Sequence, residues 1–217
     1  MTGFTDSWKF HDPTSNSSHT VTPTSSGLTI TIDSGARTDW WTTAPGSQPE
    51  SSAHRDSGPL AYQSLTLVAS QNWKLSGIVH QEGSERFQQT TLFVQRLNPK
   101  GGREGQAWLK SGIENEGGRK YVGVVATNPF SDWNVSPLSK GSSVHIEIEK
   151  TGPDVHVYYT VDGERLLLRE KKGFVLPLDG EEGKEEWWVG VMVCGPLSEG
   201  TKGKVEQVKL ELVGGSH

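Results

Sequence analysis

Residues 108–114 combine side chains whose types and spacing suit a binding or catalytic site. The even positions hold Trp, Lys, Gly and Glu, whereas Leu109 and Ile113 between them are apolar. In an extended strand, this alternation places the two apolar side chains on one face and the other four on the opposite face. An indole offers a stacking plane, the Lys and Glu offer a cation and a hydrogen-bond acceptor, and Gly112 leaves room for a ligand. We therefore expect Lys110 and Glu114 to face a groove on a concave sheet.

Neighbouring segments extend the groove by the same alternation. If Leu92 and Val94 enter the core, the odd positions of 91–95 face the groove, and the odd positions of 121–127 line it next. Two Asp- and Trp-containing segments, near residues 40 and 132, are expected to close its rim. The predicted ligand-binding residues are Trp108, Lys110, Glu114, Asp132, Trp133, Asp39, Trp41, Phe93, Gln95 and Tyr121.

Two kinds of function fit such a groove. In the first, the chain is a lectin-like binding module: a carbohydrate or similar polyhydroxylated ligand stacks on Trp108 and forms hydrogen bonds with Lys110, Glu114 and Asp132. In the second, the chain is an enzyme in which Glu114 and Lys110 are an acid/base pair. The reaction would be glycoside cleavage, or isomerisation or cyclisation of a small metabolite. Burial would raise the pKa of Glu114 or lower that of Lys110 for this purpose. A simpler alternative is a surface ion pair between Lys110 and Glu114, with Trp108 covering the sheet.

A second set of candidate catalytic groups lies at His145, Glu147 and Glu149, which share one face of an alternating segment. Retaining glycosidases need two carboxyl groups roughly 5 Å apart, and same-face residues of a strand are spaced by about 6.5–7 Å. Lys150 stands where a third acid would complete the glycosidase pattern. The segment is therefore more typical of a charged outer sheet face than of a catalytic centre.

The elements that would position these residues are strands. Segments that alternate apolar and polar residues, as half-buried strands do, lie at 28–32, 65–68, 91–96, 144–149, 155–161 and 205–213. Residues 187–194 do not alternate, which is typical of a central strand buried on both faces. Asp162-Gly163 predicts a tight hairpin. No capped segment keeps a helical apolar stripe for three turns, so the sequence predicts an all-β chain.

One segment departs from this strand pattern. Residues 42–58 are rich in Ser, Pro, Ala and Gly and contain almost nothing to bury, which predicts a flexible loop. The loop is either a disordered insertion or, because it directly follows Trp40-Trp41, a lid over the site. The rest of the chain fits one domain, 1–217, since β-sandwiches reach this length without dividing.

Composition and charge exclude several classes of function. The formal net charge is −5 with acids and bases mixed along the chain, so no basic patch for nucleic acid is expected. The apolar runs are too short to span a membrane. No cluster has the ligand spacing of a zinc site, a calcium loop or a phosphate loop, so we expect no metal and no cofactor. A structural calcium site made of carbonyl oxygens and one Asp would leave no such pattern and stays open. The first residues lack a secretory signal and Cys194 is the single cysteine, which predicts a cytoplasmic protein. The groove described above predicts a small-molecule or glycan ligand as its partner.

The order of motifs along the chain resembles a known family. W-x-K-x-G-x-E at 108–114, an apolar strand, and S-D-W at 131–133 resemble a family of unknown function named for the yeast regulation-of-enolase protein. That family is related to the concanavalin A-like domain at the C-terminus of some β-xylosidases. The resemblance extends over about 28–213, through elements at 38–41, 155–163 and 190–196. Gly195 stands where the family more often has Ser, and Thr90-Thr91 replaces its usual small pair.

This resemblance implies a fold and a class of partner. The fold is a concanavalin A-like jelly-roll sandwich of two antiparallel sheets. The family's name implies a protein partner, with the chain acting as a regulatory partner of a metabolic enzyme. The departures at residues 90, 91 and 195 mean that ligand specificity is not carried over with the fold.

Overall fold

Strands make up all the regular structure in the described part of the chain. The computed structural model describes residues 4–5, 7–48, 53–98, 107–175 and 184–214. The strands within these ranges are β1 (Lys9–His11), β2 (Ser18–Thr24), β3 (Gly27–Ser34), β4 (Trp40–Thr42), β5 (His54–Asp56), β6 (Leu60–Val68), β7 (Asn72–Gln81), β8 (Gln89–Arg96), β9 (Ala107–Glu116), β10 (Arg119–Thr127), β11 (Ser131–Pro137), β12 (Ser143–Thr151), β13 (Asp154–Val161), β14 (Glu164–Lys171), β15 (Lys184–Cys194) and β16 (Thr201–Val213). The predicted all-β fold class is confirmed.

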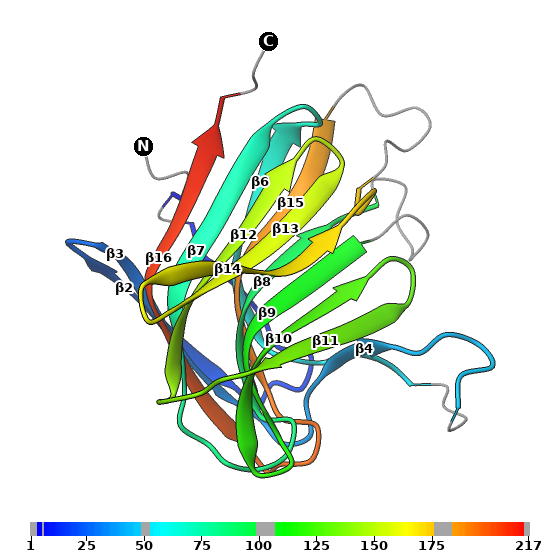
Figure 1. The fold of residues 1–217 in the computed structure, drawn as a ribbon, viewed down its shortest axis with the longest axis vertical. Coiled ribbons are helices and arrows are strands. Elements are labelled where there is room, and N and C mark those ends of the chain that lie inside the picture. The colour runs from blue at the N-terminus through cyan, green and yellow to red at the C-terminus, as the bar shows by residue number, and fades with distance from the viewer. Residues whose placement is uncertain (1–3, 6, 49–52, 99–106, 176–183, 215–217) are drawn as a thin grey trace.

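Two seven-stranded antiparallel sheets pack face to face (Figure 1). The first, here called the site sheet, has the order β1-β6-β15-β8-β9-β10-β11. The second, the outer sheet, has the order β14-β13-β12-β7-β16-β3-β2. Strands distant in sequence, such as β6 and β15, are neighbours, as expected for a jelly roll. The hairpin predicted at Asp162-Gly163 joins β13 to β14, and both residues have positive φ values of 51° and 81°.

Alternate side chains of the strands fill the space between the sheets. Leu109 and Ile113 of β9 belong to one buried apolar cluster with Leu75, Ile146 and Ile148 of the outer sheet. The opposite parity of β9 therefore faces away from this core, as the sequence predicted. Packing of this kind is the dominant source of stability for a sandwich.

Strand β15 is buried on both faces, which confirms its predicted central position. It lies between β6 and β8 in the site sheet. Trp187 enters the inter-sheet core, where its ring meets that of Trp73 edge-on with 5.2 Å between centroids. Met192 and Cys194 belong to a separate apolar cluster on the other side of the sheet. Residues of both parities are apolar for that reason.

Within the segment predicted as a flexible loop, 42–58, Thr42 and His54–Asp56 belong to the β4–β5 hairpin, and the other described residues are irregular. Thr42 ends β4 and pairs with His54 of β5, and the Thr42 N–H donates to Ser131 Oγ of β11 at 2.8 Å. Both ends of the segment are therefore paired, residues 49–52 lie outside the described residues, and the predicted flexibility of the loop stays a prediction. Each strand has only three residues, which is too short for an alternation to be detected.

Gly112 has a packing role that the sequence did not reveal. A Cβ at this position would lie 2.0 Å from the Thr90 carbonyl oxygen on β8. Gly190 of β15 stands in the same relation to the Ala61 carbonyl oxygen of β6, also at 2.0 Å. These glycines allow neighbouring strands to approach closely. The expectation that Gly112 leaves room for a ligand is wrong, because β8 occupies that space.

Candidate functional site

The β4–β5 hairpin lies on the face of the site sheet that points away from the core. Trp40 fixes it there: its ring packs against Phe93 and Trp108 with centroid distances of 4.8 and 5.7 Å. Its Nε1–H also donates to the Gly58 carbonyl oxygen at 2.8 Å. Because residues alternate along the hairpin, its two sides face two different hollows. The single groove expected from the sequence is therefore two cavities.

The first hollow, here called the Glu114 cavity, has a volume of about 460 Å³. This size lies within the range of small-molecule sites in proteins. Its lining residues are Asp39, Trp41, Ala53, Arg55, Phe87, Gln89, Lys110, Glu114, Val125, Trp133, Pro196 and Leu197.

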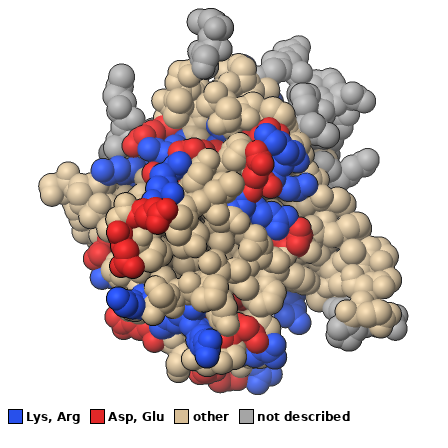
Figure 2. Space-filling model, in the orientation of Figure 1, with Lys and Arg blue, Asp and Glu red and all other residues tan. Residues whose placement is uncertain are grey.

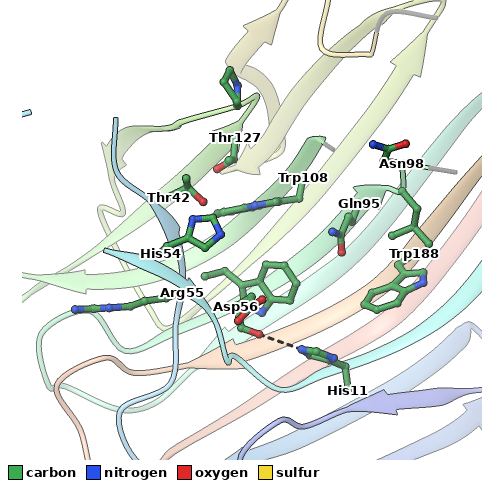
Figure 3. A pocket seen from close by; sticks show the side chains of 13 residues that line it. His11, Thr42, His54, Arg55, Asp56, Gln95, Asn98, Trp108, Thr127 and Trp188 are labelled. Carbon is green, nitrogen blue, oxygen red and sulfur yellow. Dashed lines mark hydrogen bonds between the residues drawn. The ribbon is translucent and has the colours of Figure 1, made fainter. Parts of the chain in front are cut away.

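The second hollow, here called the Gln95 cavity, has a volume of about 370 Å³ and appears in Figure 3. Its lining residues are His11, Trp40, Thr42, His54, Arg55, Asp56, Gln95, Leu97, Asn98, Trp108, Thr127, Pro129 and Trp188. Arg55 of the hairpin lines both cavities.

Glu114 is a buried carboxyl group with two hydrogen-bond donors. Gln89 Nε2 donates to its Oε1 at 3.2 Å, and Trp133 Nε1 donates to its Oε2 at 2.9 Å. The residue is only 7% exposed. Burial raises the pKa of Glu114 to about 7, although the Lys110 charge and the Trp133 hydrogen bond act in the opposite direction. At neutral pH this carboxyl group can therefore either give or take a proton.

Lys110 is committed to a different partner. Its ammonium group, 2% exposed, donates to Asp39 Oδ1 at 3.2 Å, and Arg55 Nη1 lies 3.5 Å from Asp39 Oδ2. Burial, the largest single effect, would lower the pKa of Lys110, but the acidic groups around it, led by Asp39, together outweigh burial and raise it. Lys110 thus stays charged at neutral pH. Of the two pKa shifts suggested by the sequence, the rise at Glu114 is confirmed and the fall at Lys110 is wrong.

The surface ion pair considered from the sequence is also wrong, because Lys110 and Glu114 are both buried. The Cys194 thiol lies beneath the same group, with Sγ 3.8 Å from Asp39 Oδ1. Burial raises the pKa of Cys194, so the thiol stays neutral and contributes packing.

The predicted site residues fall into three groups: those that line the Glu114 cavity, those that line the Gln95 cavity and those that line neither. The Glu114 cavity brings together Asp39, Trp41, Lys110, Glu114 and Trp133, and the Gln95 cavity takes Trp108 and Gln95. Phe93, Asp132 and Tyr121 line neither cavity. Phe93 is fully buried beneath Trp40 and Trp108.

Asp132 departs from the expectation for a geometric reason. It is the neighbour of Trp133 on β11, so the two side chains point to opposite faces. Trp133 faces the Glu114 cavity, whereas Asp132 pairs with Arg169 of the outer sheet and its side chain is 66% exposed. Tyr121 lies directly opposite Glu114 of β9 and has the groove-facing parity, but its side chain does not line the cavity.

Several lining residues of the Glu114 cavity were missed from the sequence. Gln89 lies on the same face of β8 as Phe93 and Gln95. Extending the predicted alternation from residue 91 back to residue 89 would have identified it. Arg55 and Ala53 come from the hairpin, and Pro196 and Leu197 follow β15. No local pattern marks these residues, because the fold brings them to the site.

The face that carries His145, Glu147 and Glu149 is an ion-paired outer surface. Arg165 Nη2 donates to Glu149 at 2.6 Å, and its Nε donates to Glu147. Figure 2 shows acids and bases interspersed on the face in view. The prediction of a charged outer face fits these contacts, since both carboxylates are occupied by Arg165.

Neither a metal cluster nor a membrane-spanning helix is found in the described ranges. No three His, Cys, Asp or Glu residues among them are grouped so as to hold a metal ion. No helix in that part of the chain is long and apolar enough to cross a membrane.

Comparison with solved structures supports the fold. The chain is similar to a functionally unknown protein from Saccharomyces cerevisiae, with a TM-score of 0.69 and 19% identity over 96% of this chain and 97% of that one. It is also similar to the GH43 BlXynB protein from Bacillus licheniformis, with a TM-score of 0.58 and 11% identity over 94% of this chain and 36% of that one. At these identities the likeness concerns the jelly-roll fold alone.

Comparison of sequences defines the family. An uncharacterized protein from Emericella nidulans is 25% identical over 181 residues, which span 79% of this chain and 79% of that protein. The family DUF1349, described as a protein of unknown function, matches residues 15–212. This description does not include the regulatory role that the earlier resemblance implied. The match covers most of the chain, and the chain therefore belongs to the DUF1349 family.

Proposed function

We propose that the chain is a lectin-like binding module that takes a carbohydrate or similar polyhydroxylated ligand in the Glu114 cavity. The observation that carries this proposal is the combination of polar groups with one exposed and one half-buried aromatic ring in one hollow. Glu114, Gln89 and Arg55 offer hydrogen-bonding groups, and Trp41 and Trp133 offer ring surfaces beside them.

Sugar chemistry matches this combination. The C–H faces of a pyranose ring pack on indoles, while its hydroxyl groups need both donors and acceptors. Trp133 is 37% exposed and its Nε1–H is already held by Glu114, so the ring is both accessible and fixed in orientation. Each Glu114 oxygen accepts one hydrogen bond from the side chains described above, and a carboxylate oxygen can accept a second one from a ligand hydroxyl. Arg55, with half of its side chain exposed, supplies further donors at the edge.

The fold gives independent support of a general kind. The GH43 protein named above belongs to a class of proteins that act on sugars, and it shares this jelly roll. Since a fold alone does not define a function, the proposal depends on the cavity.

Replacing Trp133 with Ala should weaken binding of a saccharide at least tenfold, because it removes a stacking surface and the hydrogen bond that orients Glu114. The measurement is a calorimetric titration with a panel of neutral oligosaccharides, preceded by ligand-observed NMR to find a binder. Phe130→Ala is the matched control, since Phe130 is an exposed aromatic that lines neither cavity. Binding that is lost equally in both variants, or a panel without any binder, would contradict the proposal.

The pKa of Glu114 favours a second candidate function, an enzyme that uses this carboxyl group as general acid or base. A group with a pKa of about 7 is suited to proton transfer at neutral pH. Lys110 would act through its fixed positive charge, since Asp39 keeps it protonated.

In that case Glu114→Gln should reduce turnover of a bound saccharide by a factor of about 100 or more, with affinity changed much less. The turnover of the unaltered chain should also follow a titration near pH 7. Products analysed by mass spectrometry during a long incubation with each binder provide the measurement. A binder that stays intact with the unaltered chain excludes catalysis and leaves the binding module.

A further inference from the structure

A tryptophan–glutamine–tryptophan row crosses the floor of the Gln95 cavity. Gln95 of β8 pairs directly with Trp108 of β9 on one side and with Trp188 of β15 on the other. Side chains in register on adjacent strands point to the same face. Two pairings place the Cα atoms of the two tryptophans roughly 9–11 Å apart. Figure 3 shows the Gln95 amide between the two indoles.

The Gln95 side-chain oxygen is an acceptor without a donor. Gln95 is 5% exposed, and its Oε1 has no hydrogen-bond partner among the described residues. Leaving such a group unpaired is costly, so buried side-chain oxygens nearly always have a partner. Because this oxygen belongs to a residue that lines an open cavity, a ligand entering the cavity can supply the missing donor.

Contacts with neighbouring aromatic rings fix the two indoles on either side of Gln95. Trp188 stacks on Tyr62 with 4.3 Å between centroids. The Trp108 ring lies nearly parallel to the Phe93 ring, with 6.1 Å between centroids, and meets the Trp40 ring edge-on. Their orientation is therefore fixed before any ligand arrives, which reduces the entropy lost on binding.

The rim of the cavity is polar, and a contact between β1 and the hairpin fixes part of it. The His11 Nε2 lies 3.0 Å from the Asp56 carbonyl oxygen, which joins β1 to the hairpin (Figure 3). Arg55 and Asp56, which carry opposite charges, both line the rim, while the floor of Trp108, Gln95 and Trp188 is uncharged. This arrangement matches a neutral ligand that has apolar faces and a hydroxyl group at its edge.

We infer that the Gln95 cavity is a second binding site, separate from the Glu114 cavity, and that it takes an uncharged pyranose ring. The ring's C–H groups pack mainly on the half-buried Trp188 and on the small part of the buried Trp108 that lines the cavity, and one hydroxyl group donates to Gln95 Oε1. The Gln95 cavity faces the opposite side of the hairpin from the Glu114 cavity, and Arg55 is the residue that the two linings share. The inference goes beyond the function proposed above and does not require the Glu114 cavity to bind.

The indole N–H signals of the tryptophans distinguish the two sites in one NMR experiment. A ¹H–¹⁵N spectrum is recorded while neutral methyl pyranosides are added, with signals assigned from single Trp→Phe variants. We expect the Trp108 and Trp188 signals to shift and to saturate in the millimolar range. Trp188→Ala and Gln95→Met should each weaken this binding at least tenfold. Trp133→Ala, which alters only the Glu114 cavity, should leave it unchanged.

Each outcome bears on one site. Shifts of Trp41 and Trp133 alone would overturn this inference and leave the proposed function standing, whereas shifts of Trp108 and Trp188 alone would do the reverse. A parallel titration with uracil, a flat uncharged heteroaromatic, tests the ligand class: if uracil shifts Trp108 and Trp188 and no pyranoside does, the sugar assignment is overturned. Trp188→Phe keeps a ring in the strand, so it provides a folded variant if Trp188→Ala or Gln95→Met does not fold, and it should weaken binding to an intermediate degree.

Discussion

Replacing Asp39 with Asn should lower the free energy of unfolding by about 3–5 kcal/mol, since the change removes the counter-charge of a buried ammonium group. Lys110 is 2% exposed and its Nζ donates to Asp39 Oδ1, so without that carboxylate the charge would remain in the protein without its closest partner. The charge of Glu114 would still act on Lys110. Because the Asp39 charge contributes to the raised pKa of Glu114, this pKa should also fall in the variant. Urea denaturation at pH 7, followed by tryptophan fluorescence, measures the change.

A matched control separates burial from the mere loss of an ion pair. Asp132→Asn also removes a carboxylate, one that pairs with Arg169, but its side chain is 66% exposed. Its loss should cost less than about 1 kcal/mol. In addition, Asp39→Asn combined with Lys110→Met should recover part of the stability, because the double change leaves no buried ammonium. Equal losses for Asp39→Asn and Asp132→Asn would show that the Lys110 pair is not an important part of the folded structure.

Strand alternation is the property that the sequence expresses most directly, and it predicted the main features of the site. Leu109 and Ile113 lie in the core, and Lys110 and Glu114 lie on the opposite side of β9 in one cavity. This works because a shift of one residue would bury charged side chains in the core and expose apolar ones, so only one register is stable. The same rule, applied more strictly, would have excluded Asp132 once Trp133 was placed.

The remaining features depend on contacts between segments that are far apart in the chain. Nothing local in 42–58 predicts that Arg55 comes within 3.5 Å of Asp39, or that Trp40 packs on Phe93. For the same reason the partner of Lys110 could not be found: Asp39 is 71 positions away. The sequence suggested Glu114, which lies on the same face of β9 as Lys110, whereas the partner in the structure is Asp39, directly before β4.

The division into two cavities changes how the tryptophans should be interpreted. On a single open groove they would form one continuous stacking platform. The hairpin instead assigns Trp41 and Trp133 to the Glu114 cavity and Trp108 and Trp188 to the Gln95 cavity, while Trp40 fastens the hairpin between them. Each cavity therefore combines aromatic surface with its own buried polar group, and the two groups differ. One can titrate near neutral pH, whereas the other is an uncharged amide.

The titration of Glu114 should make stability depend on pH in a defined window. Its pKa is about 7 in the folded chain, against an ordinary value of 4.5. Below pH 4.5 the carboxyl group is protonated in both the folded and the unfolded chain, so it contributes no pH dependence. Between pH 4.5 and 7 the unfolded chain releases the proton while the folded chain keeps it, so stability falls as the pH rises. Above pH 7 the loss is complete, at about 3 kcal/mol.

Glu114→Gln should abolish this dependence, because an amide does not titrate. The free energies of unfolding at pH 5 and pH 8 should differ by about 2–3 kcal/mol more in the unaltered chain than in the variant. Using this difference cancels the contributions of all other groups that titrate alike in both proteins. Glu199→Gln, at an exposed ion pair with Arg37, provides the same chemical change without burial and should leave the difference unaltered. Parallel pH profiles for the unaltered chain and Glu114→Gln would show that this carboxyl group is ionised in the folded protein at neutral pH. The proton-transfer role would then lose its basis, whereas hydrogen bonding of a ligand by the carboxylate would remain.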